Sequence, residues 1–223
     1  MKKKIIIPSA ILLVIVIMIV SSLFGGESKI TIDCVPVSET LQKTKNIHLK
    51  VYVENSGSMD GYMCPGSNLK DAVFDYVSDL SKMANTCSYY YINSKIIPCN
   101  MPLNSYIQNL TPQSFAKAGG NRAHTDLRNM IDTILHNQDK NTVSIFVSDC
   151  ILDVPENAID FFGNCQVSIK NSFNAALKQN PNIGVQIMKM DSKFDGYWYC
   201  SHNSEPLHNV KRPYYIWVIG DKY

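Results

Sequence analysis

The chain has 223 residues, a formal net charge of +2 at pH 7, and a hydrophobic content of 45%. So small a charge excludes the strongly basic surface typical of nucleic-acid-binding proteins, and no nucleic acid partner is expected. The composition is that of an ordinary globular protein, and the length suits one domain after an N-terminal segment.

The N-terminal segment has the pattern of a sequence directed to a membrane. Three lysines at positions 2–4 precede an uncharged, mostly apolar stretch over residues 5–24. About 20 apolar residues cross the hydrocarbon core of a bilayer, and lysines favour its cytoplasmic side. We expect residues 1–25 to be a transmembrane anchor or a cleaved signal peptide, and 26–46 to be a linker. Residues 47–223 would then form a domain in the cell envelope, or a secreted domain after cleavage.

Hydrophobic periodicity predicts strands and helices that alternate along the rest of the chain. The expected strands cover residues 47–54, 88–97, 142–147, 183–190 and 214–219. The expected helices cover 69–84 with Asn68 as N-cap, a turn near 111–117, 127–135 with Thr125 as N-cap, and 156–179. This alternation predicts an α/β fold with a doubly wound, mostly parallel sheet and helices on both faces.

Seven cysteines are spread along the chain, and no two of them have a Cys-x-x-Cys spacing. The spacing argues against a zinc ribbon and against a thioredoxin-like motif. Cys87 and Cys99 flank a predicted strand. A disulfide between them and two buried free thiols both fit the sequence.

Polar side chains gather where the expected strands end. Glu54 ends an apolar strand and is followed by Ser56 and Ser58, and Asp149 follows the strand at 142–147. Thr125 lies in a loop that enters a helix at the same edge of the sheet. Ligands of open α/β sheets bind at this edge. Hard oxygen ligands suit Mg²⁺, or Ca²⁺ or Mn²⁺, better than zinc.

These three loops resemble the metal-ion-dependent adhesion site of the von Willebrand factor A-type domain. The first loop, 54–58, reads Glu-Asn-Ser-Gly-Ser, where the family has Asp-x-Ser-x-Ser. The second contains Gly119-Gly120 and Thr125-Asp126-Leu127, and the third contains Ser148-Asp149. The resemblance implies a Rossmann-like fold and a binding module without enzymatic activity. It also implies a protein partner that offers an acidic side chain to a metal held by Glu54, Ser56, Ser58, Thr125 and Asp149.

The chain departs from the family pattern at three points. Glu54 replaces the usual Asp, Cys150 replaces a common Gly, and the family's final helix is missing after the strand at 214–219. Because Glu is one methylene longer than Asp, Glu54 would reach the ion itself and displace a water. Partner carboxylates would then bind more weakly.

Two other functions fit parts of the sequence. One is a scaffold component of an envelope assembly that keeps a vestigial, metal-free site. The other is a serine hydrolase with Ser56 or Ser58 as nucleophile, although the segment lacks the Gly-x-Ser-x-Gly pattern of a nucleophile elbow.

Overall fold

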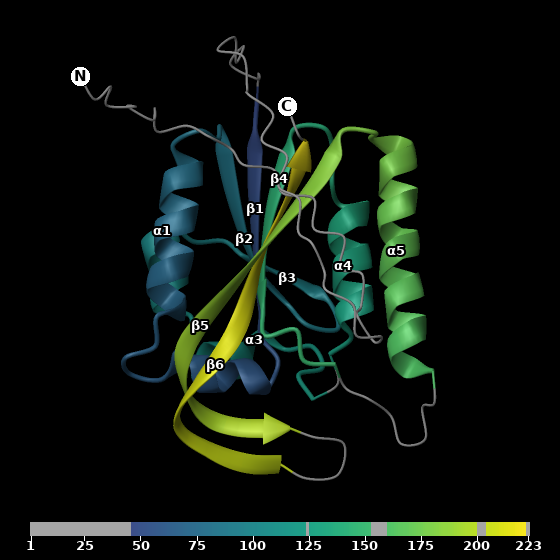
Figure 1. Ribbon diagram of the computed structural model, residues 1–223. Coiled ribbons are helices and arrows are strands. Elements are labelled where there is room, and N and C mark those ends of the chain that lie inside the picture. Colours follow the sequence, from purple (N-terminus) through teal and green to yellow (C-terminus); the bar gives the residue numbers. More distant parts are fainter. Residues whose placement is uncertain (1–45, 124, 153–159, 200–203, 222–223) are drawn as a thin grey trace, which may run out of the picture.

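The computed structural model describes residues 46–123, 125–152, 160–199 and 204–221. These residues form a six-stranded sheet with helices on both faces (Figure 1). The strands are β1 (His48–Glu54), β2 (Thr86–Ile92), β3 (Ile96–Cys99), β4 (Thr142–Ser148), β5 (Ile183–Tyr199) and β6 (Ser204–Asp221). The helices are the 3₁₀ helix η1 (Ser58–Met63) and α1 (Leu69–Ser81), α2 (Leu103–Gln108), α3 (Pro112–Ala118), α4 (Leu127–His136) and α5 (Phe161–Gln179).

The strand order is β3-β2-β1-β4-β6-β5, and most strands run in one direction. β2 and β4 both pair with β1 in parallel. β5 has the direction of β4, because each of them is antiparallel to β6. β3 is antiparallel to β2. The mixed α/β class, the mostly parallel sheet and the helices on both faces are therefore confirmed.

The alternation of side chains along β1 divides the core into two layers. Leu49, Val51 and Val53 are buried in the layer that also contains α1, α2 and α3. Tyr52 points to the other face, where it is buried in the layer that contains α4. Because both faces of β1 are covered, its apolar residues form a nearly continuous run, as expected for a central parallel strand.

The C-terminal third differs from a doubly wound sheet. The sequence predicted two short buried strands, but β5 and β6 are 17 and 18 residues long and form one antiparallel hairpin. β6 lies between β4 and β5, where a doubly wound sheet would continue in parallel after a crossover helix. The hairpin extends well beyond the other strands (Figure 1). The finer prediction of a doubly wound sheet is wrong in this part.

The hairpin packs closely on η1 through two glycines. A Cβ atom on Gly61 would collide with the ring of Phe194, which is fully buried. A Cβ atom on Gly196 would lie 2.6 Å from the Cα atom of Gly61. The rings of Phe194 and Tyr62 also meet edge to face, with their centroids 4.9 Å apart. The absence of side chains at both glycines therefore lets the hairpin reach the loop after β1.

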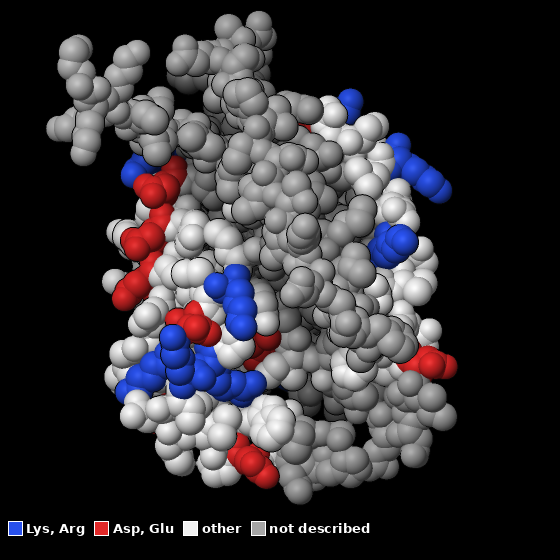
Figure 2. Space-filling model, in the orientation of Figure 1, with Lys and Arg blue, Asp and Glu red and all other residues white. Residues whose placement is uncertain are grey.

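Charges of both signs cover the hairpin. Figure 2 shows Lys and Arg side chains beside Asp and Glu side chains over its lower half. Lys211 forms an ion pair with Asp191 across the two strands, at 3.3 Å. The mixture of signs agrees with the small net charge of the chain.

One local expectation is corrected, and one open alternative is decided. Thr125 was expected to cap α4, but Asp126 is the N-cap and its carboxylate accepts from the N–H of Arg128 at 2.9 Å. Thr125 bonds to Glu54 instead. Cys87 and Cys99 are free thiols, so the disulfide between them does not form.

The expected membrane tether falls on residues that the structure does not describe. No helix in the part of the chain that the structure describes is long and apolar enough to cross a membrane. The expected anchor at 1–25 and the linker at 26–46 lie outside the described residues, apart from Asn46.

Candidate functional site

A buried glutamate lies at the carboxyl end of β1. The side chain of Glu54 is 2% exposed, although it ends a strand that is otherwise apolar at this end. Its Oε1 atom accepts a hydrogen bond from the Thr125 hydroxyl at 3.1 Å, and its Oε2 atom accepts one from the Ser148 hydroxyl at 2.5 Å. β1 and β4 are parallel, with Val53 opposite Val147, so Glu54 and Ser148 emerge side by side. Both carboxylate oxygens therefore have partners.

A second buried carboxylate, that of Asp149, lies close to Glu54. Asp149 is 6% exposed, and its Oδ1 atom accepts from the N–H of Ile151 at 3.2 Å. Burial, together with repulsion from Asp149, raises the pKa of Glu54 to about 7. Burial also raises the pKa of Asp149, while a hydrogen bond from Ser58 partly offsets the rise. Ionising both carboxyls would place two negative charges close together in a buried site. The pair therefore tends to hold one proton between them.

Buried polar atoms of Asn55, Asp149 and Arg212 have no hydrogen-bond partner among the described residues. The Oδ2 atom of Asp149 is buried and accepts no hydrogen bond, and the Nη1 atom of Arg212 is buried and donates none. The guanidinium of Arg212 is near enough to lower the pKa of Asp149. It lies over the ring of Phe194, with 4.8 Å from its Cζ atom to the ring centroid. A buried acceptor on Asp149 and a buried donor on Arg212 therefore stay without partners among the described residues.

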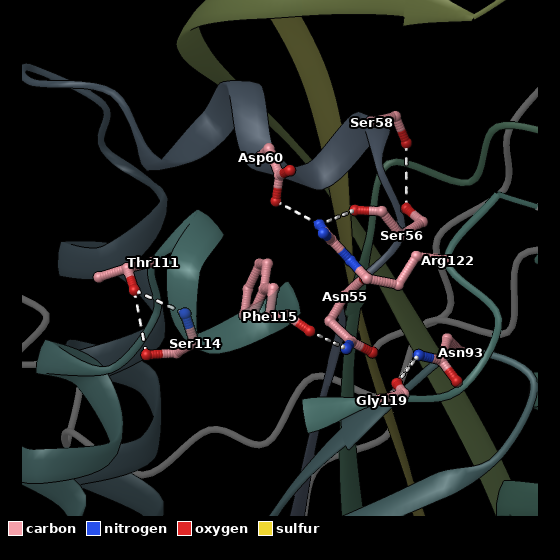
Figure 3. A network of polar contacts seen from close by, with 10 residues as sticks. All are labelled: Asn55, Ser56, Ser58, Asp60, Asn93, Thr111, Ser114, Phe115, Gly119 and Arg122. Atoms are coloured by element: carbon pink, nitrogen blue, oxygen red, sulfur yellow. Dashed lines mark hydrogen bonds and ion pairs between the residues drawn. The ribbon is translucent and has the colours of Figure 1, made fainter. Parts of the chain in front are cut away.

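Arg122 holds the loop that follows Glu54 (Figure 3). Its Nε donates to the carbonyl of Asn55 at 2.8 Å, and its Nη2 donates to the carbonyl of Ser56 at 3.3 Å. The same Nη2 atom forms an ion pair with Asp60 at 2.5 Å. In return, the N–H of Gly57 donates to the carbonyl of Arg122 at 3.0 Å. One side chain thus joins the loop, η1 and the segment before α4.

The segment that carries Arg122 is itself fixed to the sheet. Gly119 and Gly120 have φ angles of 82° and 80°, in the left-handed region that favours glycine. A Cβ atom on Gly120 would collide with the side-chain amide of Asn93. That amide donates to the carbonyl of Gly119 at 2.9 Å (Figure 3). The glycines therefore allow the close approach that delivers Arg122 to the loop.

Replacing Arg122 with Ala is expected to lower the free energy of unfolding by about 2 kcal/mol, because two carbonyls and a half-buried carboxylate lose their donors. Arg122→Lys should recover only part of this loss, since one ammonium does not replace the forked guanidinium. Urea unfolding measures the effect. Arg128→Ala is the matched control, because its ion pair with Asp126 is about one-third exposed and should contribute less than about 1 kcal/mol. Equal losses in both Ala variants would contradict the assigned role.

The structure places the five predicted site residues at one edge of the sheet, but with contacts unlike those expected. Thr125 bonds to Glu54, and Ser56 and Ser58 bond to each other at 3.1 Å (Figure 3). Among the described residues, no three His, Cys, Asp or Glu side chains come together as a metal-binding group. The hydroxyls that were expected to bind an ion instead bond to a carboxylate or to one another. The prediction of a Mg²⁺, Ca²⁺ or Mn²⁺ site is therefore corrected.

Three contributors to this site were not predicted as site residues: Ser148, Arg122 and Arg212. Ser148 has a weak signal, because it precedes Asp149 at the end of an apolar run. Arg122 and Arg212 have none, because each reaches residues that are more than 60 positions away in the sequence.

No protein-family model and no curated protein matches this chain. Two solved structures are similar to it. One is a putative methyltransferase from Thermoplasma acidophilum, 9% identical, with a TM-score of 0.30 over 79% of this chain and 70% of that chain. The other is the precorrin-6y C5,15-methyltransferase from Geobacter metallireducens, 9% identical, with a TM-score of 0.27 over 81% of this chain and 83% of that chain.

The family expected from the three loops is not borne out, because no family model matches the chain. The loop hydroxyls also bond to Glu54 or to one another, unlike the ligands of the metal-dependent adhesion site that the resemblance implied. The assignment and its non-enzymatic adhesion function are therefore not retained. Identities of 9% and TM-scores of 0.27 and 0.30 carry no activity over to this chain. The function has to be argued from the site itself.

Proposed function

We propose that this chain is an enzyme in which Glu54 and Asp149 exchange protons with a bound substrate. The observation that carries the proposal is a pair of carboxyls more than nine-tenths buried, one of which has an oxygen without a partner. They lie at the carboxyl edge of β1 and β4, where ligands of open α/β sheets bind. Strongly perturbed carboxyls in such a position are typical of acid–base catalysts.

The surroundings of the two carboxyls give them different roles. Glu54 accepts from the hydroxyls of Thr125 and Ser148 and has a pKa raised to about 7, which makes it the proton donor at neutral pH. Asp149 keeps an oxygen free to accept a proton, so it is the base. Environments that give two carboxyls different pKa values are the usual basis for assigning one as the acid and the other as the base.

The hydroxyls of the site orient the carboxyls in this proposal. Thr125 and Ser148 bond to Glu54, and Ser58 bonds to Asp149. Ser56 and Ser58 also bond to each other. The described histidines contact Thr86, Asp132 and Asp195, away from this edge. A serine with an adjacent histidine base is therefore not present among the described residues, which disfavours a serine nucleophile.

The expected protein partner with an acidic side chain depended on the metal ion. Without that ion, two carboxyls at this edge would repel a partner carboxylate. The partner stays an untested prediction, and the proposed enzyme does not depend on it.

Turnover by the full chain tests the proposal. A panel of chromogenic nitrophenyl glycosides, esters and phosphates is assayed across the pH range with the wild type, Glu54→Gln and Asp149→Asn. We expect turnover with a bell-shaped pH dependence, and a loss of at least about 100-fold in each variant. Arg128→Ala, at the exposed start of α4, is the control and should keep full activity. Turnover that survives in both carboxyl variants, or none with any substrate, would contradict the proposal.

A further inference from the structure

β5 lies at one margin of the sheet and, among the described strands, pairs with β6 alone. The pair Asp191–Pro213 shows which of its main-chain groups point outward. Proline has no N–H to donate to Asp191, and the Pro213 carbonyl accepts instead from the Tyr62 hydroxyl at 2.6 Å. Because hydrogen-bonded and non-hydrogen-bonded pairs alternate in an antiparallel ladder, every second residue from Ile183 to Lys193 directs its N–H and C=O away from β6.

The two ends of this outer edge are closed, and its middle is open. At one end the N–H of Ile183 donates to the Asn180 carbonyl at 3.1 Å. At the other end the Lys193 carbonyl accepts from the Ser192 hydroxyl at 3.2 Å and from the Cys64 thiol at 3.8 Å. Between them, the outward main-chain groups of residues 185, 187, 189 and 191 have no hydrogen-bond partner among the described residues. An open strand edge of this kind is a template for a further strand.

The side chains along the open edge are mostly apolar and half-buried. Met188 and Met190 pack against the layer that contains α1, and Val185 packs against the layer that contains α4. Lys189 is exposed and forms no ion pair with a described residue, whereas the neighbouring Asp191 has a partner in β6. A strand that fits this edge therefore needs apolar side chains on both faces and an acidic side chain opposite Lys189.

We propose that residues 31–37 of this chain, which read Thr-Ile-Asp-Cys-Val-Pro-Val, add to the outer edge of β5 as a seventh, antiparallel strand. They belong to the segment expected to be a linker. One register places the Asp33 carboxylate opposite Lys189, and pairs of opposite charge or of apolar side chains stabilise neighbouring strands. In the same register, Val35 faces Ile187, Val37 faces Val185, Ile32 faces Met190, and Cys34 faces Met188.

Pro36 gives an independent check of this register. Residues 31, 33, 35 and 37 lie opposite the outward groups of β5 and therefore bond to it. Pro36 then directs its nitrogen away from β5, where a missing N–H removes no bond of the ladder. A shift by one residue would turn Pro36 toward β5 and move Asp33 away from Lys189. Charge and proline position thus select the same register.

The connection to β1 also fits an antiparallel strand. β1 and β5 run in the same direction, so both begin at the same end of the sheet. An antiparallel strand on β5 ends at that end, with Val37 beside Val185. The lateral path to β1 crosses β5, β6 and β4, a distance of about 19 Å. Residues 38–47 reach about 33 Å when they are extended, so they can make this connection.

A disulfide from the native Cys34 to a new thiol on β5 tests the register in the full chain. Cys34 and Met188 would form a non-hydrogen-bonded pair with Cα atoms about 4.5 Å apart, which is within the range of a disulfide. On oxidation by glutathione disulfide, Met188→Cys should crosslink to Cys34 within one chain, as identified by peptide mass spectrometry. Met190→Cys is the matched control and should not crosslink, because it lies diagonally from Cys34, at about 7–8 Å.

Hydrogen exchange of the β5 amides gives a second measurement that needs no oxidation. In the wild-type chain, the N–H groups of Ile187 and Lys189 should exchange at least about 100-fold more slowly than those of an unpaired edge. Asp33→Lys should remove most of this protection, because it places a lysine opposite Lys189. Adding Lys189→Asp to the same chain restores opposite charges and should restore the protection.

Two results would overturn the proposal. One is fast exchange at Ile187 and Lys189 in the wild-type chain. The other is a Met188→Cys chain in which Cys34 stays free, or in which the new thiol crosslinks to a second copy instead. Neither result bears on the proposed acid–base pair, because the pKa of Glu54 is measured separately.

Discussion

The free energy of unfolding is expected to fall by about 2–3 kcal/mol between pH 5 and pH 8, because burial raises the pKa of Glu54 from 4.5 to about 7. The folded state then holds a proton that the unfolded state releases as the pH rises through 4.5. The stabilisation is complete below that pH and is lost as the pH rises through about 7. The raised pKa of Asp149 acts in the same direction.

Urea unfolding at several pH values measures this dependence in the wild type and in Glu54→Gln. The neutral amide cannot ionise, so Glu54→Gln should remove most of the slope and be more stable than the wild type by about 2 kcal/mol at pH 8. Asp79→Asn, at a carboxyl of α1 that is 77% exposed, is the control and should keep the slope of the wild type. A slope in Glu54→Gln equal to that of the wild type would show that other groups produce it.

Gly61→Ala is expected to lower the free energy of unfolding by about 3 kcal/mol. The added Cβ atom would collide with the Phe194 ring, which has no room to retreat because it is fully buried against Tyr62 and Arg212. The hairpin must then move away from η1, which would also displace Tyr199 from Gly57.

Gly163→Ala is the matched control for this substitution. Gly163 lies within α5, and a Cβ atom there would meet nothing within 4 Å. Because Ala is a better helix former than Gly, this variant should be more stable than the wild type by about 0.5–1 kcal/mol. Thermal or urea unfolding of both variants gives the comparison. A Gly61→Ala protein as stable as the wild type would mean that η1 and the hairpin are not tightly packed.

Much of the sheet and its helices could be predicted from local pattern. The apolar run that ends at Glu54 predicted β1, and the helical spacing after Asn68 predicted α1. The helix ends at Ser81, whereas the predicted helix ended at residue 84. The hairpin could not be predicted in the same way. From Asp195 to Tyr199 the residues are Asp, Gly and three aromatics, and they are mostly exposed, so they show no clear two-residue period.

The position of the site was predictable, but its chemistry was not. The strand ends at Glu54 and Asp149 indicated the edge of the sheet at which the candidate site lies. Hydroxyls beside carboxylates have the same sequence pattern whether they bind an ion or bond to each other, and only the contacts of Thr125 and Ser148 with Glu54 distinguish the two. The cap of α4 shows the same limit, because Thr125 and Asp126 are both good N-cap residues. The Thr125 hydroxyl bonds to Glu54, which is distant in the sequence, and Asp126 caps the helix.

The carboxyl pair is tested most directly by the titration of Glu54 itself. Carbon-13 NMR of the side-chain carboxyls in the full chain, assigned with Glu54→Gln, gives its pKa without any knowledge of the substrate. We expect a pKa of about 7, and a lower value in Asp149→Asn because the repulsion from Asp149 is removed. A Glu54 that titrates near 4.5 and does not respond to Asp149→Asn would contradict the proposed acid–base pair.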